Sequence, residues 1–262
     1  MRGRPLAWLV LIAGAVYFLA PLVATFEFSL RMKRGEYSFE AYRVVFSTAE
    51  FQGAFLYSVA QALATIVVGV ALVAPTAYWV RLRLPRLRGL VEFITLLPLV
   101  VPAIVLVFGY IRLFSSSSIL PLTSTSLGAD ALLMFGYVTL SLPYLYRSID
   151  TALAAIDVKT LTEAAESQGA GAFTILFRVI LPNIRFGVLT AFFLAFVLSW
   201  EEIGVTLFIT SVNAVTLPRM MWMGLRDNID PAIAAISVIL IIVVIAVILG
   251  KTAISALSSG RK

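Results

Sequence analysis

The amino-acid sequence predicts an all-α membrane protein with six transmembrane helices. Of its 262 residues, 61% are hydrophobic and 13% are charged, whereas soluble chains average roughly 45–50% and 25%. A soluble fold could not bury this much apolar surface. The apolar residues lie in six long, continuous runs, each close to the roughly 20 residues that a helix needs to cross a bilayer. A transmembrane β-barrel would instead show segments of about ten residues with alternating hydrophobicity.

The connections between the runs are too short for a soluble domain, which usually needs about 50 residues or more. Residues 1–262 are therefore expected to form a single transmembrane domain. Arg2 and Arg4 precede the first run, as basic residues do in a signal peptide. The run is longer than the roughly 7–15 apolar residues of such a peptide, so we interpret it as an uncleaved anchor. The predicted spans cover about residues 6–30, 55–80, 89–114, 131–149, 185–210 and 231–250.

The distribution of Lys and Arg predicts that both termini are cytoplasmic, because cytoplasmic loops of membrane proteins carry an excess of these residues. The first outer loop, with Arg31, Lys33, Arg34 and Arg43, argues weakly for the opposite orientation. With the N-terminus inside, 13 of the 20 basic residues lie inside: Arg2, Arg4, Arg81, Arg83, Arg86, Arg88, Arg147, Lys159, Arg178, Arg185, Lys251, Arg261 and Lys262.

The chain contains no Cys and no His, which excludes disulfides, thiol nucleophiles, Cys/His metal sites and His-based catalytic triads. We therefore expect no catalytic residues and no metal site, and the protein is not predicted to be an enzyme. The formal net charge of +6 is explained by loop orientation in a membrane protein and does not require a nucleic-acid partner.

The chemistry of the chain concentrates in the longest predicted cytoplasmic segment, at about residues 157–182, which begins DVKTLTEAAESQGAGAF. Thr160 followed by Glu163 is the pattern of a capping box, which predicts a helix with Thr160 as its N-cap. Gly169 and Gly171 offer positions at which this helix can end. A second helical piece is expected over residues 173–181, where Pro182 either stops it or opens the next span. One face of the first helix is small and mostly apolar, so another surface could approach it closely: Leu161, Ala164, Ala165, Gln168 and Ala172.

The segment resembles the signature loop of ABC importer permeases, which reads Glu-Ala-Ala, three residues, Gly, nine residues, Ile, one residue and Leu-Pro. Val179 stands here in the usual Ile position. The resemblance extends over about residues 55–249, where LLPLVVPAIVLVFG and LSWEEIGVTLFITSVNAVTLPRMMW are similar to permeases of the polyamine-type branch. The fixed positions of the motif are Glu163, Ala164, Ala165, Gly169, Leu181 and Pro182.

This resemblance implies a type I ABC importer permease fold in the inner (plasma) membrane of a bacterial cell. It implies that the segment docks into two ABC ATPase subunits and that a second permease, more often a paralogue than a copy, completes the path. An extracytoplasmic solute-binding protein would deliver the substrate. No G-x-x-x-x-G-K-[ST] sequence occurs in this chain, so ATP and Mg are expected on the partner ATPase, and no cofactor is expected on this chain.

Four residues inside the predicted spans are candidates for the translocation path. Pro98 and Pro102 in the third span remove helix hydrogen bonds, which produces either a cavity-lining break or ordinary bending. Glu201 and Glu202 fall within the fifth span, where a charge costs at least ~2.5 kcal/mol and usually faces a bundle interior or a watery cavity. Alternatively, the span ends at Ser199 and both acids are interfacial, or Arg112 or Arg219 neutralises them.

The sequence between the fifth and sixth spans, TLPRMMWMGLRDNIDP, predicts a short amphipathic helix at the outer surface. Pro218 can open this helix at its first turn, and Asp230 can cap the last span, which begins at Pro231. The apolar side is expected to consist of Met220, Met221, Trp222 and Leu225.

Three other functions compete with the importer permease. An ion-coupled secondary transporter would use Glu201 and Glu202 and would need no docking loop. A membrane-embedded enzyme would need a cluster of catalytic groups, and only this acid pair is available. A purely structural scaffold would not need the docking motif. The substrate follows only from the resemblance and the acid pair, which together favour a polyamine or a related cation.

Overall fold

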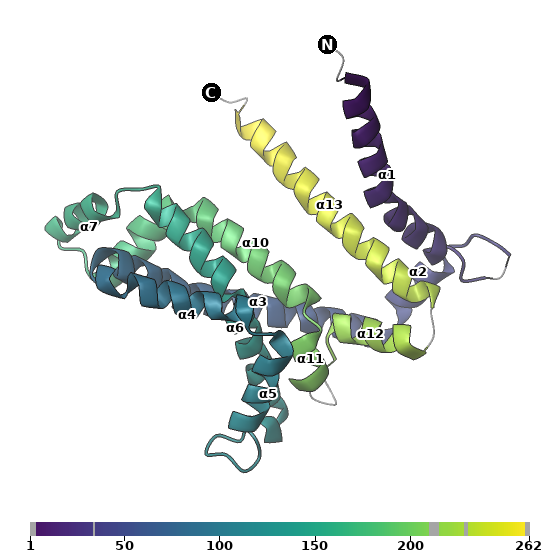
Figure 1. The fold of residues 1–262 in the computed structure, drawn as a ribbon, viewed down its shortest axis with the longest axis horizontal. Helices are drawn as coiled ribbons and strands as arrows, with labels where there is room; N and C mark the ends of the chain where they lie inside the picture. Colours follow the sequence, from purple (N-terminus) through teal and green to yellow (C-terminus); the bar gives the residue numbers. More distant parts are fainter. Residues whose placement is uncertain (1–3, 34, 210–214, 228–229, 260–262) are drawn as a thin grey trace. The chain divides into compact units, whose positions relative to one another are not determined.

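The computed structural model describes residues 4–33, 35–209, 215–227 and 230–259. Within these residues the regular structure is helical, apart from one isolated β-bridge between Lys33 and Glu36. The chain forms two compact units (Figure 1), a terminal unit of Met1–Gln52 with Met220–Lys262 and a central unit of Gly53–Arg219. Several residues used in the predictions lie outside the described residues: Arg2, Arg34, Arg261, Lys262 and those at positions 210–214 and 228–229.

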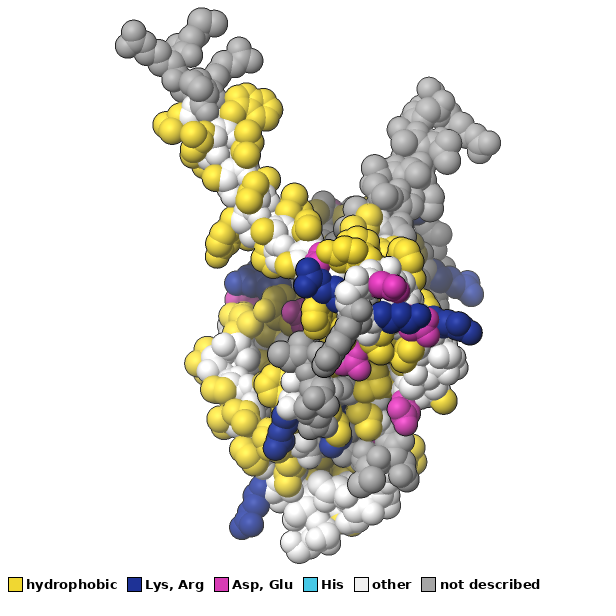
Figure 2. Space-filling model, turned by 90° about the vertical axis from the view of Figure 1, so that its right-hand side faces the viewer, with side chains coloured by type: hydrophobic (Ala, Val, Ile, Leu, Met, Phe, Trp, Pro, Cys, Tyr) yellow, Lys and Arg dark blue, Asp and Glu magenta, His cyan; other side chains and the backbone are white. Residues whose placement is uncertain are grey.

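The terminal unit contains the first and last long helices of the chain. The helix α13 (Pro231–Ser259) packs against α1 (Arg4–Ser29) and against the short helix α2 (Glu40–Ser47). In α1, the stretch Leu6–Ser29 is long and apolar enough to cross a membrane, and none of its most apolar window is buried inside the protein. Hydrophobic side chains cover much of the helical surface drawn in Figure 2, as expected for helices that contact lipid.

The central unit is built on three long helices. The helix α6 (Ser126–Ala154) packs along α10 (Arg185–Glu201) and also contacts α4 (Arg88–Val100). Buried aliphatic side chains from α3 (Ala49–Leu82), α6 and the segment before α10 form its main core. The fully buried members of this core include Val73, Leu145, Ile149, Leu153, Ile175 and Ile180.

The ends of these helices define their directions. The Tyr57 hydroxyl near the start of α3 donates to Asp130 Oδ1 near the start of α6 at 2.6 Å, and Arg81 near the end of α3 reaches Asp150 near the end of α6 at 2.7 Å. The helices α3 and α6 are therefore parallel. Trp200 at the end of α10 contacts Phe55 at the start of α3, so α10 runs antiparallel to both.

The predicted third span is broken in two. The helices α4 and α5 (Ala103–Leu113) meet at an angle of 105°. Between them, Val101 is extended with ψ 120° and Pro102 has ψ 137°, because a residue that precedes proline is pushed out of the helical region. Pro98 lies inside α4 and does not interrupt it. The break therefore occurs at Pro102, and of the two outcomes expected for these prolines the structure shows a break in the third span rather than ordinary bending.

By length and composition, three described helices can cross a membrane: α1, α3 and α6. The number rises to five if each of two bent pairs counts as one span, namely Pro85–Val100 with Ala103–Leu113, and Ala172–Asn183 with Arg185–Glu201. The described part of α13 adds a shorter apolar stretch, Pro231–Ile245. The prediction of an all-α chain with several membrane-crossing helices is confirmed, with three to five candidate spans among the described residues.

Candidate functional site

The signature motif lies in a segment of four helical pieces, which we call the EAA segment (residues 157–183). It comprises α7 (Val158–Ser167), α8 (Ala172–Thr174), the π-helix η3 (Ile175–Ile180) and α9 (Leu181–Asn183). Figure 1 shows α7 at the end of the central unit where α3 ends and α4 begins. The predicted first helix is present, but it starts earlier than expected.

The N-cap of α7 is Asp157, and the predicted capping box of Thr160 with Glu163 was wrong. Asp157 Oδ1 accepts from the backbone N–H of Thr160 at 3.2 Å, and its Oδ2 accepts from the Thr160 hydroxyl at 2.7 Å. These hydrogen bonds hold the pKa of Asp157 below its ordinary value, and the bond from the Thr160 hydroxyl has the largest effect. Asp is among the strongest N-cap residues, and here it stands three positions before the Thr that the capping-box pattern selected.

The acid and the first alanine of the motif face outward. Glu163, freed from capping, lies 3.8 Å from Lys159 one turn earlier, and 62% of its side chain is exposed. Ala164 is also exposed, whereas Ala165 is half-buried against the main core. An exposed ion pair such as Lys159–Glu163 is weak. The Glu163 carboxylate is therefore available to a partner.

Gly169 ends α7 in a left-handed conformation with φ +78°. Its N–H donates to Glu166 O at 2.9 Å, and the N–H of Ala170 donates to Ala165 O at 3.1 Å, which together form a Schellman motif. A Cβ at Gly169 would meet nothing within 4 Å, so the requirement for Gly is conformational. The prediction that Gly169 ends the helix is confirmed.

The opposite face of α7 is anchored to the last turns of α3. Thr162 is buried, and its hydroxyl lies 3.0 Å from the Tyr78 hydroxyl of α3. Val158 is buried beside it. Arg83, just after α3, pairs with the exposed Glu166 at 3.1 Å. The helix is therefore fixed on one side and open on the other.

The second half of the EAA segment is helical from Ala172 to Asn183, slightly longer than predicted. Pro182 lies exposed inside its last piece, while Leu181 and Val179 are half-buried against the main core. The direction changes at Ile184, which has φ −100° and ψ 16°, and α10 then continues at 83° to the preceding piece. The Leu-Pro pair thus precedes the bend that joins the EAA segment to the next long helix.

The predicted acid pair lies at a second break. The helix α10 ends at Glu201, Glu202 is extended with ψ 112°, and α11 (Gly204–Ile209) follows. Glu202 Oε1 accepts from the backbone N–H of Val205 at 3.2 Å, so this half-buried carboxylate caps its own chain. Glu201 is exposed. The helical run of the predicted fifth span therefore stops at Glu201, two residues after Ser199, and a separate short helix follows the pair.

The sequence reasoning missed an ion cluster, which we call the Asp150 cluster (Arg81, Arg88, Glu92 and Asp150). Asp150 Oδ1 lies 2.7 Å from Arg81 Nη2, and Oδ2 lies 3.2 Å from Arg88 Nη2. Arg88 Nε also lies 3.0 Å from Glu92. Only 11% of the Asp150 side chain is exposed. The available signal was an acid near the end of one predicted span and two arginines flanking others.

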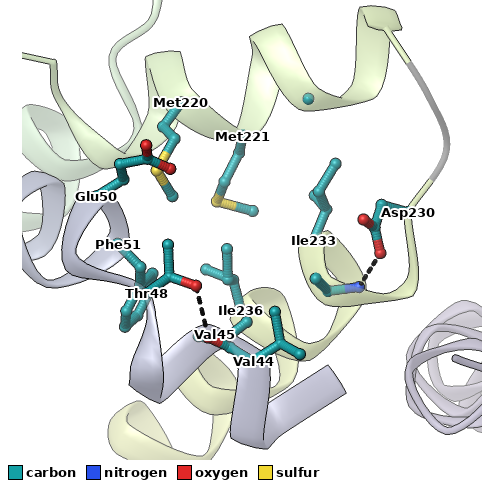
Figure 3. Close-up of a pocket in the computed structure, with 12 residues that line it drawn as sticks. Val44, Val45, Thr48, Glu50, Phe51, Met220, Met221, Asp230, Ile233 and Ile236 are labelled. Atoms are coloured by element: carbon teal, nitrogen blue, oxygen red, sulfur yellow. Dashed lines mark hydrogen bonds between the residues drawn. The ribbon is translucent and has the colours of Figure 1, made fainter. Parts of the chain in front are cut away.

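The predicted amphipathic helix is present as α12 (Leu217–Asp227). In the terminal unit, Met220 and Met221 point from α12 into a pocket of about 300 Å³ (Figure 3), while Trp222 and Leu225 are about half exposed. The Asp230 carboxylate accepts from Ala232 N at 2.8 Å and caps α13, as predicted. The other pocket residues come from α2, the start of α3, α12 and α13: Val44, Val45, Thr48, Glu50, Phe51, Gly224, Ile233 and Ile236.

The fold and the EAA segment define an inner-membrane transport subunit, and comparison with known families agrees. Residues 66–258 match the family described as "Binding-protein-dependent transport system inner membrane component". The match covers more than half of the chain, so the chain belongs to this family, whose members are non-catalytic, multi-pass proteins of the bacterial inner membrane.

The relatives of this chain are named for different substrates. The chain is 32% identical to the molybdenum transport permease ModB of Mycobacterium bovis over 93% of this chain and 91% of that protein. It is 29% identical to the spermidine/putrescine permease PotC of Haemophilus influenzae, over 81% and 80%. The 28% identical match to PotC of Escherichia coli spans only 46% of that relative. A bacterial ABC transporter that imports alginate shares the fold, with a TM-score of 0.69 at 17% identity over 95% of this chain and 94% of that one.

Proposed function

We propose that this chain is a permease subunit of an ATP-driven, binding-protein-dependent importer and forms half of the path for a small solute. The observation that carries the proposal is the construction of α7. Its Glu163–Ala164 edge is exposed, its opposite face is buried, and Gly169 closes its end. Such a helix can receive a force from outside and pass it to the core without unfolding.

The partners follow from this role. Two ABC ATPase subunits lie beneath the two permeases and bind ATP and Mg, one of them docks on the EAA segment, and this chain binds no cofactor. Within the segment, Glu163 and Ala164 contact the ATPase, and Ala165 and Leu181 connect the contact to the core. Gly169 and Pro182 set the shape. A second permease, a paralogue by resemblance, completes the path, and an extracytoplasmic binding protein delivers the solute.

The proposed topology is a single domain of six spans with both termini cytoplasmic, as in type I importers. The parallel directions of α3 and α6 support it, because the chain must cross the membrane once between them, and α4 with α5 supplies that crossing. The α3–α4 turn and the EAA segment then lie on one side, where Arg81, Arg83 and Arg86 favour the cytoplasm.

Cysteine labelling tests this topology, since the native chain has no Cys. We expect Ser117→Cys to react with an impermeant thiol reagent from outside in intact cells and Gln168→Cys to react only after the membrane is opened. The reverse pattern contradicts the orientation.

The proposed path runs beside Pro98 of α4 and the two helix breaks of the central unit, at Pro102 and at Glu201–Glu202. Irregular backbone is tolerated at membrane depth only where it is buried in protein or lines a water-filled cavity. Glu201 is the better candidate to face the path, because Glu202 already accepts a hydrogen bond from its own chain.

A polyamine or related cation is our proposed substrate. The exposed carboxylate of Glu201 supports it, since a negative charge at about 4 Å contributes roughly 4 kcal/mol at an effective dielectric constant of 20, before desolvation. A relative named for molybdenum and one named for 2-aminoethylphosphonate make anionic or zwitterionic solutes the outcomes to compare. Uptake of labelled spermidine, molybdate and 2-aminoethylphosphonate by the complete system decides between them.

Reconstitution in liposomes tests the importer itself against an ion-coupled transporter. The chain is combined with its partner permease, ATPase and binding protein, and uptake is measured with ATP or with an ion gradient. We expect uptake to require ATP and to survive ionophores. Glu163→Lys should abolish substrate-stimulated ATP hydrolysis, whereas Glu36→Lys, an exposed acid in the terminal unit, should not. Uptake driven by the ion gradient and unaffected by Glu163→Lys would support the alternative that uses Glu201 and Glu202.

A further inference from the structure

The end of α3 contacts both the EAA segment and the core of the central unit. Tyr78 meets Thr162 of α7 at 3.0 Å, and Arg83 meets Glu166 at 3.1 Å. Arg81, which lies between Tyr78 and Arg83 in the sequence, binds Asp150 of α6. Any displacement of α7 that moves the last turns of α3 therefore acts on the bond between Arg81 and Asp150.

Asp150 joins three helices. Arg81 donates to its carboxylate through Nε at 3.3 Å and Nη2 at 2.7 Å, and Nη2 also donates to its backbone oxygen at 3.1 Å. Arg88, the first residue of α4, donates to the other carboxylate oxygen at 3.2 Å. The carboxylate therefore holds the end of α3 and the start of α4 against α6.

A second partner for this carboxylate is already nearby. Tyr146 lies one turn before Asp150 on α6, a spacing that places the two side chains on the same face. Tyr146 is 2% exposed, and among the described residues none hydrogen-bonds to its hydroxyl. A buried hydroxyl without a partner is costly, and this one stands on the same face of α6 as Asp150, with Arg81, Arg88 and Glu92 gathered around that carboxylate.

We propose that Asp150 is a positioning residue of the transport cycle, which binds Arg81 in the arrangement seen here and exchanges that bond for the Tyr146 hydroxyl when α7 is displaced. The exchange gives α3 two positions relative to α6, which is the kind of two-state element that coupling between distant sites needs. The proposal rests on the function proposed above, because the displacement of α7 comes from the ATPase.

The test measures solute taken up per ATP hydrolysed in the complete liposome system. We expect Asp150→Asn, Arg81→Gln and Tyr146→Phe each to lower this ratio at least about fivefold, the lower limit of typical coupling effects, while ATP hydrolysis and assembly persist. Asp150→Asn combined with Arg81→Gln should be no worse than either alone. Arg31→Gln, which removes a guanidinium from the exposed pair with Glu27 in the terminal unit, is the matched control and should leave the ratio unchanged.

Tyr146→Phe separates positioning from stability, because its hydroxyl makes no hydrogen bond among the described residues and its loss should not lower Tm. An unchanged ratio in Tyr146→Phe overturns the exchange. Failure of Asp150→Asn and Arg81→Gln to assemble with the ATPase assigns the cluster to stability alone and also overturns the proposal. If the native complex shows no ATP-driven uptake, the proposed function fails first, and the two failures are thus distinguishable.

Discussion

Two acids in the central unit, Glu163 of α7 and Glu202 after α10, are placed in opposite ways. In α7, Glu163 points outward, and Gly169 closes the helix by backbone hydrogen bonds alone. Just after α10, the Glu202 carboxylate reaches forward and accepts a hydrogen bond from the N–H of Val205 in α11. The first carboxylate is available to another molecule, whereas the second is used by its own chain. An acid in a functional segment is therefore informative only once its hydrogen bonds are known.

The largest effect is expected from changing how α7 ends. Gly169→Val places a β-branched residue at φ +78°, and the left-handed conformation costs about 1–2 kcal/mol, enough to reduce the correctly folded end about tenfold. Substrate-stimulated ATP hydrolysis should fall accordingly.

Gly171→Val is the matched control for this change. Gly171 is extended with φ −77° and ψ 161°, a conformation that Val favours, and a Cβ there meets nothing within 4 Å. Equal losses in the two variants would show that bulk matters and that the conformation of Gly169 does not.

A smaller effect is expected at the second acid. Glu202→Ala removes the hydrogen bond to Val205 and should lower the free energy of unfolding by about 0.5–1 kcal/mol, measured as a lower Tm in lipid nanodiscs. Glu202→Gln keeps an acceptor and should retain most of the stability.

Glu201→Ala should not change Tm, because that side chain is exposed. If the solute is a cation, Glu201→Gln should lower its uptake more than Glu202→Gln does. A larger Tm loss in Glu201→Ala than in Glu202→Ala would reverse the comparison between the two acids.

The smallest effect is expected when the pH is lowered, which weakens the N-cap at the start of α7. Because its folded pKa is lowered, Asp157 contributes stability above its ordinary pKa of 3.8, and this contribution is lost as the pH falls through the lowered value. Hydrogen exchange of residues 158–167, corrected for intrinsic rates, should show lost protection below that pH. Asp157→Asn caps without titrating, so its protection should not change over the same range.

The sequence was sufficient to predict what depends on local pattern. The long apolar helices, the end of α7 at Gly169 and the short helix α12 all follow from residues that are near one another in the chain. The start of α7 was misassigned because two capping residues, Asp157 and Thr160, stand three positions apart. Both can accept a backbone hydrogen bond, and Asp157 outcompetes Thr160 with two oxygens, one of which also binds the Thr160 hydroxyl.

The remaining features depend on distant contacts. Arg81 and Arg88 are 69 and 62 positions from Asp150, and no local pattern brings them together. An end of the fifth span near Ser199 was one of the alternatives, but the separate helix α11 beyond the acids was not expected, because the apolar run continues after them. The one local sign in the sequence of a break between α10 and α11 is Gly204. The structure shows why a glycine suits that position, since a Cβ there would lie 2.9 Å from Glu202 Oε1.

Photocrosslinking at two adjacent alanines of the motif shows whether α7 is open to the ATPase on one side and anchored to the core on the other. Ala164 is exposed and Ala165 is half-buried against the core, and the absence of native Cys allows Ala164→Cys and Ala165→Cys each to carry one benzophenone maleimide. In the assembled complex, we expect Ala164→Cys to crosslink to the ATPase subunit and Ala165→Cys to crosslink mainly within the chain. Equal crosslinking of both positions to the ATPase, or of neither, would contradict the account of α7 as a helix open to the ATPase on one side and anchored on the other.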